Sequence, residues 1–225
     1  MKTTFYLLVL SCVFLSTTNV NAQSTLRNRN FSELLMRSPA YEVYLDLRGE
    51  PFLFSDWAKA KVTTDYATTE DVKMLYNEVS DELTFKVAKR DVRKVSAPVK
   101  EFAITDEKNG NVVRKFRAGF KDTKFSNAET FFEVLVDGDT KLLKKNLKYI
   151  YQNREYSGKV ARTVVDDPTY YLVFNDNVPI KLKSNQKLFV SQFGEKLKDL
   201  DKYIQENELD VKKQADLIKL VSQYN

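Results

Sequence analysis

The middle of the chain alternates between apolar and polar residues, the period of a half-buried β-strand. Strand-like runs recur at short spacing at residues 59–64, 71–77, 82–87, 99–105, 111–116, 131–136, 140–151, 169–174 and 178–182. Asn109-Gly110 and Asp137-Gly138 separate neighbouring runs, and such dipeptides favour tight hairpin turns because both residues tolerate a positive φ. The pattern predicts an antiparallel β-meander, as a half-closed sheet or a barrel-like one.

Near Asn185 the apolar period changes to that of a helix. The apolar residues that share one helical stripe are Phe189, Phe193, Leu197, Leu200 and Ile204. We expect Asn207 to end this helix and Asp210 to cap a second one that runs to about Gln223. The chain should therefore close with a helical hairpin at about 185–223, docked on the sheet because its apolar stripe is too large to leave in water.

These elements predict an α+β protein with one β-rich domain over residues 41–225. Residues 23–40 precede it as an exposed lead-in, with one helical turn expected at Ser32–Met36. The chain contains no internal repeat and no linker rich in proline, glycine or serine, which favours a single domain.

The first 22 residues have the three parts of a secretory signal peptide. Lys2 precedes an apolar run from Phe5 to Leu15, and small residues lead to Ala22. We expect cleavage after Ala22 and a secreted or periplasmic protein. The alternative is lipidation of Cys12, but the apolar run continues past that residue. No later segment is apolar enough to predict a transmembrane helix.

Composition excludes several kinds of chemistry. The 225 residues include no histidine and one cysteine, Cys12, which lies in the predicted signal peptide. Imidazole bases, catalytic triads and thiol nucleophiles are therefore excluded for the exported chain. No glycine-rich nucleotide loop occurs, and no cofactor is expected. The net charge is +5, but charges of both signs are interspersed, so a nucleic-acid partner is not expected.

A lysine-rich run at 141–148 is the strongest charge signal in the chain. A two-residue turn at Asp137-Gly138 would place Phe132 opposite Leu143, and alternation then separates two faces. The predicted apolar face comprises Phe132, Val134, Leu143, Leu147, Tyr149 and Tyr151; the polar face comprises Glu133, Lys144, Asn146 and Lys148. Glu133 and Lys144 are close enough to pair. We interpret the run as a solvated strand face; the alternative is a basic site for an acidic partner.

The remaining candidates have ordinary structural explanations. Phe52, Phe54 and Trp57 could form an aromatic platform, and the acidic pairs Asp137/Asp139 and Asp166/Asp167 could bind calcium. Neither acidic pair belongs to a calcium-loop motif, and acidic residues are common in turns. Tyr170 and Tyr171 should point to opposite sides of their strand. No catalytic residue, binding residue or metal ligand can be singled out.

Four stretches together resemble a group of secreted proteins from Bacteroidota-type bacteria that has no assigned activity. They read GEPFLFSDW, LYNEVSDELTFK, FFEVLVDGDTKLLKK and DLIKLVSQYN. The resemblance implies an exported or envelope location and transfers no catalytic pattern.

Three hypotheses follow for function. The first is an exported non-enzymatic protein that binds an apolar ligand or another envelope protein. The second is a carboxylate-based hydrolase acting on a glycan, which requires two acids in one cleft, one of them with a raised pKa. The third is electrostatic binding to an anionic surface. An enclosed apolar cavity would favour the first, and paired acids in an open cleft the second.

Overall fold

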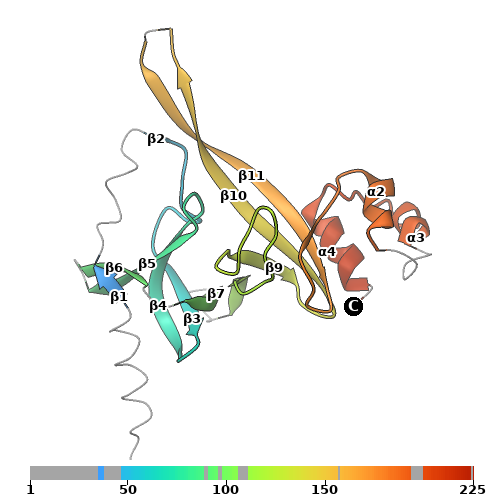
Figure 1. Cartoon of the computed structure of the whole chain (residues 1–225), viewed down its shortest axis with the longest axis horizontal. Helices are drawn as coiled ribbons and strands as arrows, with labels where there is room; N and C mark the ends of the chain where they lie inside the picture. The colour runs from blue at the N-terminus through green and yellow to red at the C-terminus, as the bar shows by residue number, and fades with distance from the viewer. Residues whose placement is uncertain are drawn as a thin grey trace, which may run out of the picture.

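The computed structural model describes residues 35–37, 47–88, 91–95, 98–105, 111–156, 158–193, 200–223 and 225. One twelve-stranded sheet dominates these residues, and three short helices follow it (Figure 1). The strands are β1 Leu35–Arg37, β2 Leu47–Arg48, β3 Ala58–Thr64, β4 Thr68–Asn77, β5 Glu82–Ala88, β6 Asp91–Val95, β7 Val99–Thr105, β8 Val112–Arg117, β9 Phe132–Val136, β10 Thr140–Arg154, β11 Val160–Phe174 and β12 Ile180–Lys181. The predicted α+β class, with an antiparallel meander before C-terminal helices, is confirmed.

The sheet consists of two meanders joined side by side. Strands β3 to β6 pair in sequence, as do strands β7 to β12, and an antiparallel ladder between β3 and β7 joins the two series. β1 pairs with β6 at one end, and β12 pairs with β11 at the other. Among the described residues, the order of paired strands therefore runs from β1 to β12 without returning to its start, so the sheet is not closed into a barrel. β2 lies off this path, parallel to β11, which makes the sheet mixed.

The first meander, with β7 and β8, encloses an aromatic core. Phe102 and Phe116 stack with ring centroids 4.6 Å apart, and Tyr76 packs on both at 5.2 and 5.5 Å. Offset and tilted ring pairs of this kind add to the stabilisation from buried apolar area. This core lies on the face of β8 that also carries Arg114, whose guanidinium group is 5.2 Å from the Phe116 ring centroid.

The long β10–β11 hairpin is covered on both faces at its base. On one face Leu142 and Leu172 pack with the C-terminal helices. On the other, Phe132 lies 5.5 Å from Phe120 and 5.3 Å from Tyr171 between ring centroids. Beyond this base the hairpin rises out of the body of the protein (Figure 1).

The C-terminal helices dock on the sheet as predicted, but there are three described pieces where two helices were expected. They are α2 Gln186–Ser191, α3 Leu200–Glu206 and α4 Gln214–Gln223. Asn185 caps α2 by accepting the Leu188 N–H at 3.2 Å. The helix ends at Ser191 because the next side chain, Gln192, binds the backbone of β12 and its neighbour, at Lys181 O and Lys183 N.

The described residues of the apolar stripe in the predicted first helix are buried. Phe189, Phe193, Leu200 and Ile204 pack with Leu142 and Leu172 in a second core, which lies between the helices and the sheet. Leu197 lies outside the described residues. Asp210 does not begin the last helix, which starts at Gln214. The carboxylate of Asp210 instead accepts the Lys212 N–H in the preceding turn.

Two further sequence predictions need correction. The Phe132–Leu143 register is wrong, because the loop between the strands is longer than a two-residue turn: Val136 lies opposite Leu142 and, after a bulge between Leu142 and Leu143, Val134 lies opposite Leu143. The helical turn at Ser32–Met36 is replaced, in its described part, by strand β1, whose pairing with β6 outweighs weak local helix propensity.

The signal peptide, most of the lead-in and the Asn109-Gly110 turn lie outside the described residues. In the part of the chain that the structure describes, none of the helices combines the length and apolarity needed to cross a bilayer.

Candidate functional site

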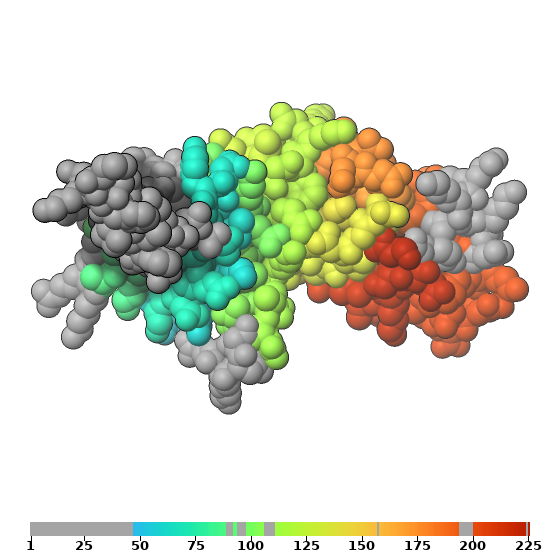
Figure 2. Space-filling view, turned by 90° about the horizontal axis from the view of Figure 1, so that it is seen from below, coloured from blue at the N-terminus to red at the C-terminus, as the bar shows by residue number. Residues whose placement is uncertain are grey.

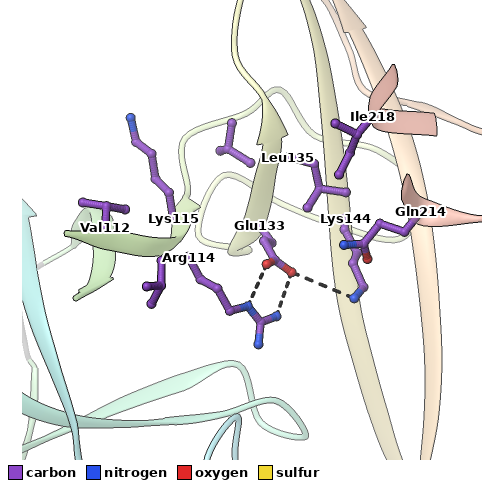
Figure 3. Close-up of a pocket in the computed structure, with 10 residues that line it drawn as sticks. Val112, Arg114, Lys115, Glu133, Leu135, Lys144, Gln214 and Ile218 are labelled. Carbon is purple, nitrogen blue, oxygen red and sulfur yellow. Dashed lines mark hydrogen bonds and ion pairs between the residues drawn. The ribbon is translucent and has the colours of Figure 1, made fainter. Parts of the chain in front are cut away.

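A groove crosses the sheet between the aromatic core around Phe102 and the second core beneath the C-terminal helices. Strand β8 forms one wall, helix α4 the other, and β9 with β10 forms the floor (Figure 3). Figure 2 shows the surface hollowed between the green β8 segment and the red α4 helix. Its volume of about 550 Å³ falls in the range of small-molecule sites. The groove exists because the aromatic core and the helices cover the same face of the sheet on either side of β9.

Glu133 stands at the centre of the floor and is buried. Arg114 binds it with two hydrogen bonds, from Nε to Oε1 and from Nη2 to Oε2, both 2.7 Å long. Asn146 donates a third at 3.2 Å. Burial acts to raise the pKa of Glu133, but the hydrogen bonds and charge of Arg114, helped by Asn146 and Lys144, outweigh it. Its pKa therefore lies below the usual 4.5, and the carboxylate is ionised at neutral pH.

Lys144 differs from Arg114 and Asn146 because it approaches Glu133 without a hydrogen bond. Its ammonium group lies 4.0 Å from Glu133 Oε2, beyond hydrogen-bonding distance, and its side chain is only 18% exposed. Glu133 is already satisfied by Arg114 and Asn146. One carboxylate thus faces two cations, and the groove floor carries an excess positive charge at Lys144.

The groove wall beside Lys144 is amphiphilic. Leu135 and Ile218 supply apolar surface from β9 and α4, close to the polar end of Gln214 (Figure 3). Gln214 Oε1 accepts the Tyr170 hydroxyl at 3.2 Å. Within the described residues its amide N–H groups have no acceptor, so Gln214 can donate to an anion held by Lys144.

A smaller recess of about 240 Å³ adjoins the groove and shares Arg114 and Lys144 with it. Glu78 and Asp166 both line it, and Lys148 Nζ lies 3.0 Å from Glu78 and 3.7 Å from Asp166. Burial raises the pKa of Glu78 and outweighs the lowering effect of Lys148. Lys148 also donates to the backbone carbonyls of Glu50 and Phe52.

On the opposite face of β10, Lys145 binds Asp81 in the β4–β5 turn. Asp81 also accepts the Tyr76 hydroxyl at 2.5 Å and the Phe131 N–H at 3.3 Å. We refer to the Asp81–Lys145 and Glu78–Lys148 pairs together as the clasp. Because β9 pairs with β10 only as far as Lys144, the β4–β5 turn can lie against the β10 edge beyond it and bind both lysines.

The interpretation of the 141–148 lysines as a solvated face is therefore wrong. The side chains of Lys141, Lys144, Lys145 and Lys148 are between 12% and 18% exposed, and each has an acidic residue within 4.0 Å. The predicted pairing of Glu133 with Lys144 is confirmed as an ion pair at that limit. The acidic partners of Lys145 and Lys148 were missed, because they come from a turn far earlier in the sequence.

The other sequence candidates lie away from the groove floor. Trp57 is partly buried, with the Lys86 ammonium 5.5 Å from its ring centroid, and Phe54 is 38% exposed. Asp137 forms a bidentate pair with Arg117 at 2.8 and 3.0 Å, which occupies both carboxylate oxygens.

Tyr170 and Tyr171 point to opposite sides of β11, as predicted. Tyr171 is buried in the cluster with Phe132, and Tyr170 packs with the helices. Within the described ranges, no group of three acidic, histidine or cysteine side chains forms a metal-binding cluster.

A comparison of the chain with protein-family models, with curated proteins and with solved structures finds no match in any of the three.

Proposed function

We propose that this protein is exported and acts by binding, without a catalytic step, and that the groove holds a ligand with an apolar body and one anionic group. The observation that carries the proposal is Lys144, a largely buried ammonium group whose neighbouring carboxylate is already satisfied by Arg114. A bound carboxylate or phosphate would give Lys144 a counter-charge that it does not share with Arg114.

The shape and lining of the groove support an amphiphile over a purely apolar ligand. The groove is open and its lining mixes Leu135 and Ile218 with charged side chains, unlike the enclosed apolar cavity that a simple hydrocarbon would require. Apolar contacts with Leu135 and Ile218 would supply most of the free energy of binding, and Lys144 with Gln214 would fix the orientation.

Calorimetric titration with decanoate tests the proposal, with decanol and acetate as the uncharged and tail-free controls. We expect decanoate to bind at least about tenfold more tightly than either control. Lys144→Gln should reduce decanoate affinity to that of decanol. Lys115→Gln is the matched control, because Lys115 also lines the groove but projects away from Glu133 and binds Glu101 and Asp137 (Figure 3). Equal affinity for decanoate in both variants would contradict the proposal.

A carboxylate-based hydrolase is the second candidate, favoured by one observation in the recess. Glu78 has a raised pKa and shares that recess with Asp166, the combination that glycoside hydrolysis needs. It ranks second because the Lys148 ammonium lies within 3.7 Å of both carboxylates and so occupies space between them. Release of reducing sugar from purified cell-wall glycan, lost in Glu78→Gln, would establish this activity in place of simple binding.

A further inference from the structure

The outer half of the β10–β11 hairpin is a separate feature, which we name the arm: Tyr149–Arg154 on β10, Val160–Val165 on β11, and the described turn residues 155, 156, 158 and 159. It extends well beyond the cores that cover the base of the hairpin (Figure 1). A long hairpin left bare is unusual, because a two-stranded ribbon is marginally stable in water without further packing.

One face of the arm is apolar and uncovered. Tyr149 and Tyr151 stand on this face and are 45% and 55% exposed. Their cross-strand partners are Val165 and Thr163. Strand alternation places both tyrosines on the same side of β10 as Leu143. Leu143 is buried in a cluster with Phe132, whereas no described residue covers the two tyrosines. An apolar strip of this kind marks a surface for interaction.

Among the residues that the structure describes, the outer edge of β10 has no backbone partner along the arm. Lys148 N donates outward to Glu78 O at 3.4 Å, away from β11. Backbone groups alternate in direction along a strand, so the N–H and C=O groups of Ile150, Gln152 and Arg154 face the same edge. In the described ranges no strand pairs with that edge. The β11 edge differs, because β2 pairs with it at Arg162 and Thr163.

Charge on the arm selects the partner. The basic residues are Arg154, Lys159 and Arg162, and the one acidic residue, Glu155, already binds Arg48 at 2.8 Å. Two arms carrying the same excess positive charge would repel each other when paired side by side. An acidic segment of a different protein would be attracted, most strongly at low ionic strength.

We propose that the arm binds an extended segment of an acidic partner protein, which adds as a strand to the free edge of β10. Along such a strand side chains alternate. One set would lie beside Tyr149 and Tyr151 and should be apolar, while the other would lie beside Gln152 and Arg154 and should be acidic. The arm thus recognises a segment in which apolar and acidic residues alternate, through backbone pairing supported by charge.

The probe is an end-blocked twelve-residue peptide of alternating valine and glutamate, titrated against the full-length protein by fluorescence anisotropy at low salt. We expect it to bind, and binding should weaken at least about tenfold when the peptide nitrogens are methylated along both edges, because the peptide then cannot donate backbone hydrogen bonds to β10 in either direction. A valine–lysine peptide should not bind. Raising the salt concentration should weaken the valine–glutamate complex.

Gln152→Pro supplies the matching change on the protein. Proline removes an outward N–H on an edge strand and leaves the β10–β11 ladder intact. Peptide affinity should fall about tenfold in this variant and stay unchanged in Gln152→Ala. If Gln152→Pro fails to fold, the methylated peptide still tests backbone pairing.

Four results would overturn the inference. Two concern the peptide: equal affinity for the methylated and unmethylated forms, or no binding of the valine–glutamate peptide at about 1 mM. The third, concentration-dependent self-association that Gln152→Pro abolishes, would assign the edge to a second copy of the chain. The fourth, sedimentation with phosphatidylglycerol vesicles that depends on Tyr149 and Tyr151, would assign the arm to a membrane surface.

Discussion

Glu133 and Glu78 are both buried, both acidic and both bound to a cation, yet their pKa values shift in opposite directions. Glu133 receives two hydrogen bonds from Arg114 and one from Asn146. Glu78 has a single lysine, Lys148, which it shares with Asp166 and two backbone carbonyls. The difference teaches that an opposite charge alone does not offset burial of a carboxylate. Several well-directed hydrogen bonds to the ionised form are required as well.

The largest effect should come from removing Arg114. Arg114→Met leaves Glu133 buried without its main partner, and loss of one member of such a pair costs about 3–5 kcal/mol in the free energy of unfolding. Urea unfolding at neutral pH measures this loss. Lys115→Met, the next residue on the same strand, should cost less than about 1 kcal/mol, because its ion pairs with Glu101 and Asp137 are more exposed. Similar losses in the two variants would remove the special role of the Arg114–Glu133 pair.

An intermediate effect, dependent on pH, is expected for Glu133→Gln. Because the folded protein lowers the pKa of Glu133, the ionised carboxylate stabilises the fold above its unfolded pKa, and this contribution disappears as pH falls through the folded value. The variant should be about 2 kcal/mol less stable than wild type at neutral pH. The gap should close progressively below pH 4.5. Urea unfolding of both proteins across this pH range measures the difference in the free energy of unfolding. A difference that stays constant with pH would show that the charge of Glu133 does not contribute to stability.

The smallest effect, with the opposite sign, is expected for Glu78→Gln. A raised pKa means that ionisation of Glu78 disfavours the folded state, so its favourable contribution is complete below pH 4.5 and is lost as pH rises through the folded value. The variant should be more stable than wild type at neutral pH by less than about 1 kcal/mol, and equal to it in acid. The same series of urea unfolding measurements at several pH values gives the stability change for Glu78→Gln and for Glu133→Gln. If Glu78→Gln is as damaging as Glu133→Gln, the Lys148 bond outweighs burial.

Features encoded within short stretches of sequence were predictable. Alternation together with Asp137-Gly138 predicted the β9–β10 hairpin, and the pairing of Glu133 with Lys144 followed from it. The stripe containing Phe189 and Ile204 predicted helices docked on the sheet, and both residues are buried. Each of these features depends on residues that are close in sequence and on the period of one element.

Features that depend on how the two meanders meet were not predictable. The lysine run looked solvated because its acidic partners, Glu78 and Asp81, lie in a turn that reaches β10 only after the first meander curls over it. The groove and the recess arise from the same meeting of distant elements. The loop between β9 and β10 is longer than a two-residue turn, since Val136 lies opposite Leu142, and alternation alone could locate neither this longer loop nor the bulge beside Leu143.

The clasp also has a consequence for the order in which the parts of the molecule are expected to fold. The β3–β4 and β10–β11 hairpins close over few residues and can form quickly, whereas Lys145 and Asp81 are 64 positions apart in the chain. Their bond cannot form until both meanders exist, because it joins a turn of the first to a strand of the second. We therefore expect the two meanders to dock after the hairpins form, and this docking brings Arg114 of β8 and Glu78 together in the recess. The recess requires residues of both meanders, Glu78 from the first and Arg114 from the second, so it cannot be complete before they dock.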